Sequence, residues 1–203
     1  MTLELYFSGA SPFVRKVDVL LREAGLREQV TNIPVHNTIL EPNEDVARTN
    51  PVGKVPALVR DDGPALYDSR VICRFIDSMA SRDFYPESRL LEVLTLEATA
   101  DGILEAALFI VYEHRLRPET KHHTPILDGQ WLKVTRSLDA LENRWMSHLQ
   151  GPLTMVQIAI GCALGYLDFR HGDRDWRNGR PQLDEWFKSF ADRPSMQATA
   201  PTG

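Results

Sequence analysis

The sequence predicts two successive parts, an α/β domain built on a four-stranded mixed sheet and an all-helical domain. Up to about residue 80, short segments that alternate apolar and polar residues are separated by turn residues and helical patterns. Beyond residue 87, apolar residues recur only at the three- and four-residue spacing of helices. The stretch 81–86, which contains Pro86, is the predicted linker. We therefore expect one domain at residues 1–80 and a second at residues 87–203.

The first domain should alternate strands with helices. Strands are expected at residues 3–7, 29–35, 57–60 and 64–67, and helices at residues 12–24 and 69–79, with a short helix or irregular connector at 38–49. Ser11 as N-cap and Pro12 at the first helical position open the first helix, and Gly25 ends it. Asp61-Asp62-Gly63 predicts a hairpin turn. The opening strand, helix and strand favour a parallel pair with a right-handed crossover, so the sheet should be mixed with helices on both faces.

The second domain should consist of four longer helices. They are expected from about residue 90 to before Pro118, through residues 131–145 to a stop at Gly151-Pro152, from Thr154 to about residue 169, and around residues 183–190 after Pro181. Thr154 and Gln157 form the pattern of a capping box, in which each side chain bonds the other's backbone region. The helix that they begin is apolar on nearly all sides, so we expect it at the centre of this domain.

Composition excludes several classes of function. The chain has 203 residues, of which 43% are hydrophobic and 25% charged, as in ordinary soluble proteins. A net charge of -5 without any basic block argues against nucleic acid as a partner. Residues 153–167 form the longest apolar stretch, which is too short to span a membrane, and the N-terminus lacks a signal-peptide pattern. Cys73 and Cys162 are interpreted as buried thiols in a reducing cytoplasm, and no spacing predicts a metal site.

The stretch 50–58, which reads Asn-Pro-Val-Gly-Lys-Val-Pro-Ala-Leu, predicts a rigid loop that leads into a strand. A cis bond between Val55 and Pro56 would reverse the chain sharply and turn the N–H and C=O of Val55 outward. Those groups could then pair with an extended peptide as a neighbouring strand does. The alternative is an ordinary rigid turn.

Four stretches together resemble the cytosolic glutathione S-transferase superfamily: residues 11–17, residues 50–58, Tyr67-Asp68-Ser69 at a helix start, and the capping box after Gly151. The sequence Ser-Pro-Phe-Val-Arg-Lys at 11–16 is similar to the first helix of a bacterial branch. The resemblance covers nearly the full length. It implies a thioredoxin-like N-terminal domain, an all-helical C-terminal domain and usually a homodimer. Gln157 departs from the family pattern, in which aspartate is common at that position.

The resemblance implies that Ser11 is the catalytic residue. A free thiol has a pKa of about 8.5, and the thiolate is the nucleophile, so an enzyme that uses glutathione must favour the anion. Ser11 lies at the positive end of the first helix, where its hydroxyl can donate to the sulfur. A purely structural N-cap role is the alternative, and Ser8 is the rival donor. Because serine cannot form a mixed disulfide, Ser11 favours conjugation over thiol–disulfide exchange.

Five further residues are implied as contacts of glutathione. Val55, beside cis Pro56, would pair with the cysteinyl backbone. Asp68 would bind the γ-glutamyl ammonium, and the Ser69 hydroxyl with the helix N-terminus would bind the α-carboxylate. Lys54 is the candidate for the glycyl carboxylate, with a solvated loop lysine as the alternative.

The predicted function is conjugation of glutathione to a small hydrophobic or electrophilic co-substrate by a cytoplasmic detoxifying transferase that requires no metal. The alternatives are a glutathione-binding or interaction module without catalysis and a glutathione-dependent peroxidase, reductase or isomerase. A second substrate should lie against the long helix, in a region that packing explains equally well: Asp101, Leu104, Leu108, Tyr112 and Arg115.

Overall fold

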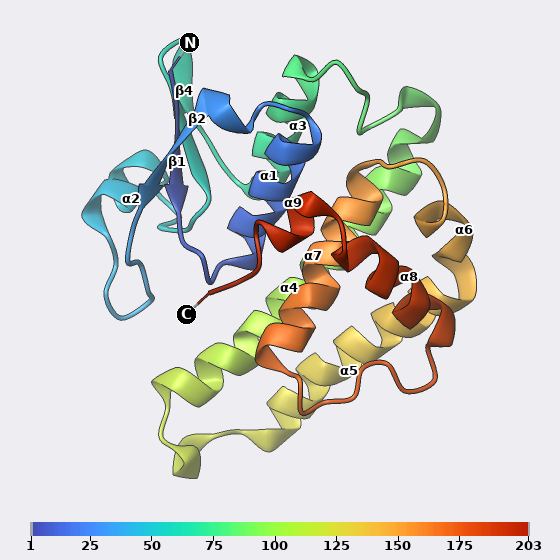
Figure 1. Cartoon of the computed structure of the whole chain (residues 1–203). Helices are drawn as coiled ribbons and strands as arrows, with labels where there is room; N and C mark the ends of the chain where they lie inside the picture. The colour runs from blue at the N-terminus through green and yellow to red at the C-terminus, as the bar shows by residue number, and fades with distance from the viewer. Residues whose placement is uncertain (1, 203) are drawn as a thin grey trace. The chain divides into compact units, whose positions relative to one another are not determined.

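The structure is a computed structural model in which residues 2–202 are described. Contacts divide the chain into two units (Figure 1). One comprises the residues up to Tyr85 together with those from Pro194 onwards, and the other comprises Pro86–Arg193. The first unit holds a four-stranded mixed sheet with helices, and the described residues of the second form helices and loops. The predicted fold class is confirmed.

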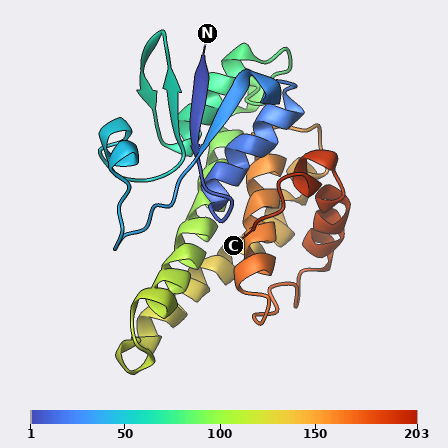
Figure 2. The same cartoon turned by 60° about the vertical axis from the view of Figure 1, so that its left-hand side comes forward.

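The first unit is organised around the sheet, whose strand order is β2-β1-β3-β4. The strands are β1 (Leu3–Phe7), β2 (Val30–Pro34), β3 (Ala57–Arg60) and β4 (Gly63–Leu66). The helices are α1 (Pro12–Glu23), η1 (Arg27–Gln29), α2 (Glu44–Thr49), α3 (Ser69–Met79) and α9 (Pro194–Gln197). β1 pairs in parallel with β2 and antiparallel with β3, and β3 and β4 form the predicted hairpin. α1 and α3 cover one face of the sheet, whereas α2 lies on the other (Figures 1 and 2).

The C-terminal segment 194–202 packs against α1 (Figure 1). The Arg15 guanidinium donates to the Met196 carbonyl oxygen at 3.1 Å, and the Ser195 hydroxyl donates to the Glu23 carboxylate at 2.5 Å. At the end of this segment, the Thr202 N–H donates to the Gly9 carbonyl oxygen at 3.4 Å. The sequence analysis placed this segment in the helical domain, and the structure differs because polar groups of α1 and of the loop before it hold the segment.

The second unit is a helical bundle. Its helices are η2 (Glu87–Arg89), α4 (Leu90–Leu116), η3 (Glu119–Lys121), α5 (Thr124–Ala140), the π-helical turn η4 (Leu141–Trp145), α6 (Met146–Leu149), α7 (Met155–Arg170) and α8 (Pro181–Ala191). The single helix expected through residues 131–145 is thus divided by a π-helical turn. α7 is buried along most of its length and packs against α4 and α8, as its all-round apolar character predicts.

Side-chain caps fix the helix ends in this unit. The capping box of Thr154 and Gln157 is confirmed. A second cap comes from Glu142 in η4, whose carboxylate accepts from the Leu183 N–H at 2.8 Å at the start of α8. Within residues 2–202, none of the helices combines the length and the apolar character that crossing a membrane requires.

Candidate functional site

Three segments of the first unit meet at one end of the sheet. β1 and β3 are antiparallel, and Tyr6 pairs with Ala57, so the loop after β1 and the loop before β3 leave the sheet at the same end. β4 returns antiparallel to β3, with Leu66 opposite Leu58, so the chain after Leu66 reaches that end as well. The register of the sheet therefore brings together the segments that carry Ser11, Val55-Pro56 and Asp68-Ser69.

Ser11 is the N-cap of α1, as predicted. Its backbone is extended, with φ -82° and ψ 118°, and its hydroxyl oxygen accepts from the Val14 N–H at 3.3 Å. The Ser11 N–H in turn donates to the Ser8 carbonyl oxygen at 3.0 Å, which closes the turn after β1. The cap uses a lone pair of the hydroxyl and not its hydrogen. Ser11 can therefore cap α1 and still donate a hydrogen bond to an anion at the helix N-terminus.

The loop before β3 is held by an asparagine whose role the sequence analysis missed. Asn50, which is 2% exposed, donates through Nδ2 to the Lys54 carbonyl oxygen at 2.8 Å. Its Oδ1 accepts from the Val52 N–H at 3.0 Å, and Gly53 supplies the positive φ of 66° that the turn requires. An asparagine before Pro-x-Gly is a signal for this kind of turn, because its side chain bonds the backbone two residues on.

The bond between Val55 and Pro56 is cis, as expected. Pro56 is buried, and Val55 is half-buried. Among residues 2–202, the N–H and C=O of Val55 have no hydrogen-bond partner. Lys54 beside it is exposed and forms no ion pair within the described part of the chain. The loop thus presents the N–H and the C=O of Val55 and one cation.

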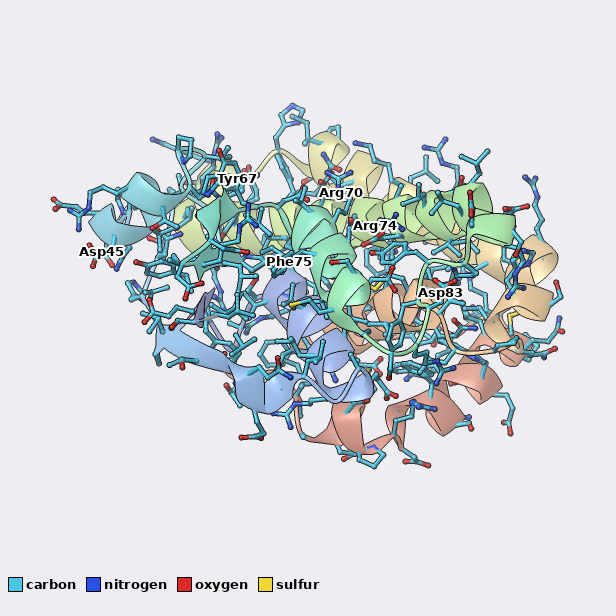
Figure 3. All side chains as sticks on the ribbon, turned by 90° about the horizontal axis from the view of Figure 1, so that it is seen from above. Asp45, Tyr67, Arg70, Arg74, Phe75 and Asp83 are labelled. Carbon is cyan, nitrogen blue, oxygen red and sulfur yellow. The ribbon has the colours of Figure 1, made fainter. Side chains whose placement is uncertain are left out.

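Asp68 and Ser69 begin α3. The Asp68 carboxylate caps the helix by accepting from the Arg70 N–H at 3.0 Å, and it also pairs with the Arg70 guanidinium at 2.8 Å. Arg70 lies on the first turn of α3 (Figure 3). Ser69 is 2% exposed, and its hydroxyl bonds to none of the described residues. Ser69 is therefore a buried polar group at a helix N-terminus with its hydrogen-bonding capacity unused by residues 2–202.

The charge of Asp68 is stabilised by its neighbours. Partial burial alone would raise the pKa of this carboxyl, but the hydrogen bonds from Arg70 and the positive charges of Arg70 and Lys16 together hold it below its usual range. Lys16 is 0% exposed, which is uncommon for a lysine. Helical periodicity gave no signal for this burial, since a lysine stem packs like an apolar chain.

No group of three or more metal-ligating side chains occurs within residues 2–202. The chemistry of the site is that of hydroxyls, backbone amides and opposed charges at two helix N-termini. Such groups bind carboxylates and other anions together with an extended backbone.

Known proteins match the chain over most of its length. A family model described as the N-terminal domain of glutathione S-transferase matches residues 10–79, and one for the C-terminal domain matches residues 124–189. The uncharacterized GST-like protein YibF of Escherichia coli is 36% identical, with 98% of each chain covered.

Two solved structures are especially similar. A glutathione transferase family member from Pseudomonas fluorescens Pf-5 with bound glutathione superposes with a TM-score of 0.97 at 41% identity, over 100% of both chains. A family member from the same organism with bound S-(propanoic acid)-glutathione gives a TM-score of 0.92 at 41% identity, over 99% of this chain and 100% of the other. Together with the two family models, these similarities show that the chain belongs to the glutathione S-transferase family.

Proposed function

We propose that the chain binds glutathione at the end of the sheet in its first unit and conjugates it to small electrophiles. The observation that carries this proposal is the meeting of three kinds of group there: a helix-capping hydroxyl, the backbone N–H and C=O of the residue before a cis proline, and a buried serine at a second helix start. Glutathione offers a thiol, a peptide backbone and a charged γ-glutamyl end, which are the three matching partners. The bound glutathione in the Pseudomonas relative supports the same ligand.

Ser11 stabilises the thiolate in this proposal. Lowering the thiol pKa by one unit requires about 1.4 kcal/mol of preference for the anion. A hydrogen bond to a charged acceptor contributes about 1.5–3 kcal/mol, so a single hydroxyl suffices for one to two units. The N-terminus of α1 adds a positive field at the same place.

The rest of the tripeptide binds to the other two segments. The free N–H and C=O of Val55 pair with the cysteinyl residue of glutathione. The Ser69 hydroxyl and the N-terminus of α3 bind the α-carboxylate, and Asp68 binds the ammonium group while it keeps its bond to Arg70. Lys54 binds the glycyl carboxylate as a point charge from the loop.

Conjugation then consists of one substitution or addition at the electrophilic carbon, with the glutathione sulfur as the nucleophile. The thiolate lone pair forms a C–S bond to the electrophilic carbon, and a leaving group departs with its bonding electrons. In an addition to an alkene, the π electrons move to the neighbouring carbon, which takes a proton from solvent. The relative that holds S-(propanoic acid)-glutathione carries a substituent on the glutathione sulfur, which supports this chemistry over disulfide exchange.

The test compares Ser11→Ala with Ser8→Ala and wild type. Conjugation of 1-chloro-2,4-dinitrobenzene at pH 6.5 should fall about tenfold to a hundredfold in Ser11→Ala, the equivalent of one to two pKa units of the thiol. Ser8→Ala removes a neighbouring hydroxyl from the same loop and should keep the wild-type rate. Full activity of Ser11→Ala, or loss only in Ser8→Ala, refutes the assignment of Ser11.

Glutathione binding is measured separately by calorimetry. Ser69→Ala should bind glutathione about tenfold more weakly, because one hydrogen bond to a carboxylate is lost. Binding by wild type without turnover of any electrophile would identify a binding module instead of an enzyme. Turnover coupled only to peroxide or disulfide reduction would identify a glutathione-dependent peroxidase or reductase.

The proposal includes a cytoplasmic homodimer. Tyr67 and Val71 at the start of α3 are 36% and 46% exposed, and Val52 of the neighbouring loop is 62% exposed. These apolar side chains would be covered by a second copy of the chain. Sedimentation should give twice the mass of one chain, and Val71→Glu should shift it toward the monomer. A wild-type monomer at micromolar concentration contradicts this part of the proposal.

A further inference from the structure

The C-terminal segment 194–202 reaches the turn that joins β1 to α1, which is the turn that carries Ser11 (Figures 1 and 2). The beginning of the segment is buried beside α1, where Ser195 is 6% exposed and Met196 is 2% exposed. From residue 198 onwards its residues are exposed or half-buried, so this part of the segment buries little apolar surface. Hydrogen bonds to α1 and to the turn hold it instead.

Arg15 joins the segment to the first turn of α1. Its guanidinium donates to the Met196 carbonyl oxygen at 3.1 Å and to the Thr199 hydroxyl oxygen at 3.4 Å. The Thr199 hydroxyl in turn donates to the Ser195 carbonyl oxygen at 2.8 Å. The backbone N–H of Arg15 donates to the Ser11 carbonyl oxygen at 3.0 Å. One residue therefore bonds the N-cap of α1 through its backbone and the C-terminal segment through its side chain.

Gly9, which lies in the turn itself, is the second contact of the segment. Its carbonyl oxygen accepts from the Thr202 N–H at 3.4 Å. A Cβ atom at Gly9 would lie 2.6 Å from Oγ1 of Thr202, which is too close without a shift of one of the two atoms. The φ angle of Gly9 lies outside the left-handed region, so its backbone conformation does not require glycine. The close approach of the segment accounts for the glycine at this position.

The two contacts lie on either side of Ser11 in the chain, two residues before it and four residues after it. A hydroxyl that stabilises a thiolate must keep its direction, because a hydrogen bond weakens steeply as its angle departs from linear. A displacement of about 1 Å in a catalytic arrangement can lower the rate about a hundredfold. The segment thus holds the backbone before and after the residue whose direction the proposed function depends on.

We propose that the segment 194–202 positions the Ser11 hydroxyl for the glutathione sulfur, through its contacts with Arg15 and Gly9. Arg15 and Gly9 are positioning residues, since they act through Ser11. This inference rests on the proposed function, because it concerns the residue that binds the thiolate there. Completion of the core explains the buried beginning of the segment, but it requires neither of these contacts.

The experiment disturbs the segment in two independent ways. Arg15→Gln removes the guanidinium that donates to the segment, and Thr202→Pro removes the N–H that donates to Gly9 without any change of charge. Each variant should raise the pKa of the thiol of bound glutathione by about half a unit to one unit, measured by titration of the ultraviolet absorbance of the thiolate. Conjugation of 1-chloro-2,4-dinitrobenzene should fall about threefold to tenfold at a pH below the wild-type thiol pKa, and it should approach the wild-type rate above the raised pKa.

Each variant has a matched control. Thr202→Ala keeps the N–H that bonds Gly9 and should keep the wild-type thiol pKa. Arg48→Gln removes an exposed arginine from α2 of the same unit, so it controls for the loss of one positive charge, and it should also keep the wild-type thiol pKa. The dissociation constant of glutathione, measured at a pH at which the thiol is protonated, should stay near the wild-type value in all four variants, because other segments bind the rest of the tripeptide.

A raised thiol pKa in both Arg15→Gln and Thr202→Pro, with both controls unchanged, supports the inference. A raised pKa in only one of the two overturns it, and in Arg15→Gln alone the lost positive charge explains the effect. Variants that lower the unfolding temperature but keep the wild-type thiol pKa also overturn it and assign the segment to stability.

Failure of the proposed function is a separate result, in which wild type does not bind glutathione or Ser11→Ala keeps the wild-type thiol pKa. Hydrogen exchange of the Ser11 N–H, which donates to the Ser8 carbonyl oxygen within the turn and needs no ligand, then decides whether the segment fixes the turn. Exchange about tenfold faster in both Arg15→Gln and Thr202→Pro supports this role of the segment, and wild-type exchange in either variant overturns it.

Discussion

Both the oxygen and the nitrogen of the Gln157 side-chain amide form hydrogen bonds, and this leads to a prediction for Gln157→Glu. The residue is 3% exposed. Its Oε1 accepts from the N–H and the hydroxyl of Thr154 at 2.8 and 2.9 Å. Its Nε2 donates to the carbonyl oxygens of His148 and Pro152 at 2.8 and 2.9 Å. Glutamate has the same shape and can accept in the same way, but its ionised carboxylate would put an oxygen against two carbonyl oxygens. The variant should therefore fold with the carboxyl protonated.

The free energy needed to keep the carboxyl protonated gives the expected loss of stability. With an unfolded-state pKa of about 4.3, keeping the carboxyl protonated costs about 3.7 kcal/mol at pH 7 and about 1 kcal/mol at pH 5. Loss of one donated hydrogen bond adds about 1 kcal/mol at either pH. Because the folded-state pKa is raised, the folded state binds more protons, and the stability of the variant falls as pH rises from about 4.3 toward that pKa. The deficit against wild type should thus grow by up to about 2.6 kcal/mol between pH 5 and pH 7.

Urea unfolding followed by tryptophan fluorescence measures this deficit. All four tryptophans lie in the unit Pro86–Arg193, so the signal reports the unit that contains Gln157. Gln157→Met removes the same polar groups without adding an ionisable one, and its deficit should be equal at pH 5 and pH 7. A deficit of Gln157→Glu that does not change with pH, or wild-type stability at pH 7, refutes the assigned donor role of Nε2.

Three further predictions concern other caps and anchors. Glu142→Gln should lower the free energy of unfolding by about 1–2 kcal/mol, because the charged acceptor of the Leu183 N–H is lost, and an unchanged urea midpoint would contradict it. Asp68→Asn should weaken glutathione binding by about tenfold in calorimetry at pH 7. Since the pKa of Asp68 is lowered, its charge persists as pH falls, and wild-type affinity should show no titration of this carboxyl above about pH 4. Arg15→Gln should speed hydrogen exchange in residues 194–202 by about tenfold, whereas equal exchange would show that the bond to Met196 does not hold the segment.

Local signals were sufficient to predict the sheet and the starts of α1 and α7. Ser11-Pro12 and the pair Thr154 and Gln157 are short patterns whose physical effect lies within one helical turn, and both caps occur as expected. The hairpin of β3 and β4 follows from a glycine-containing turn between two short β-rich runs. The π-helical turn Leu141–Trp145 was missed because apolar spacings of three and four residues continue through it. Periodicity alone does not reveal one residue inserted into a helix.

Contacts between residues far apart in the sequence could not be predicted from local sequence patterns. The bond between Arg15 and Met196 joins residues 181 positions apart, and nothing near either residue indicates the other.

The candidate glutathione site could be predicted from the sequence because the first N–H groups of a helix have no partner within that helix. Such groups can bind a ligand where the helix begins next to the end of a strand. Ser11 and Ser69 both occupy such starts, and the sequence marks them equally. The structure separates them: the Ser11 oxygen already accepts a bond from α1, whereas the Ser69 hydroxyl bonds to none of the described residues. An anion at Ser69 therefore gains a hydroxyl donor that no described residue uses, and an anion at Ser11 gains the proton of a hydroxyl that is held in place. Removing Ser69 should weaken binding, and removing Ser11 should mainly slow the reaction, because only the thiolate changes charge during it.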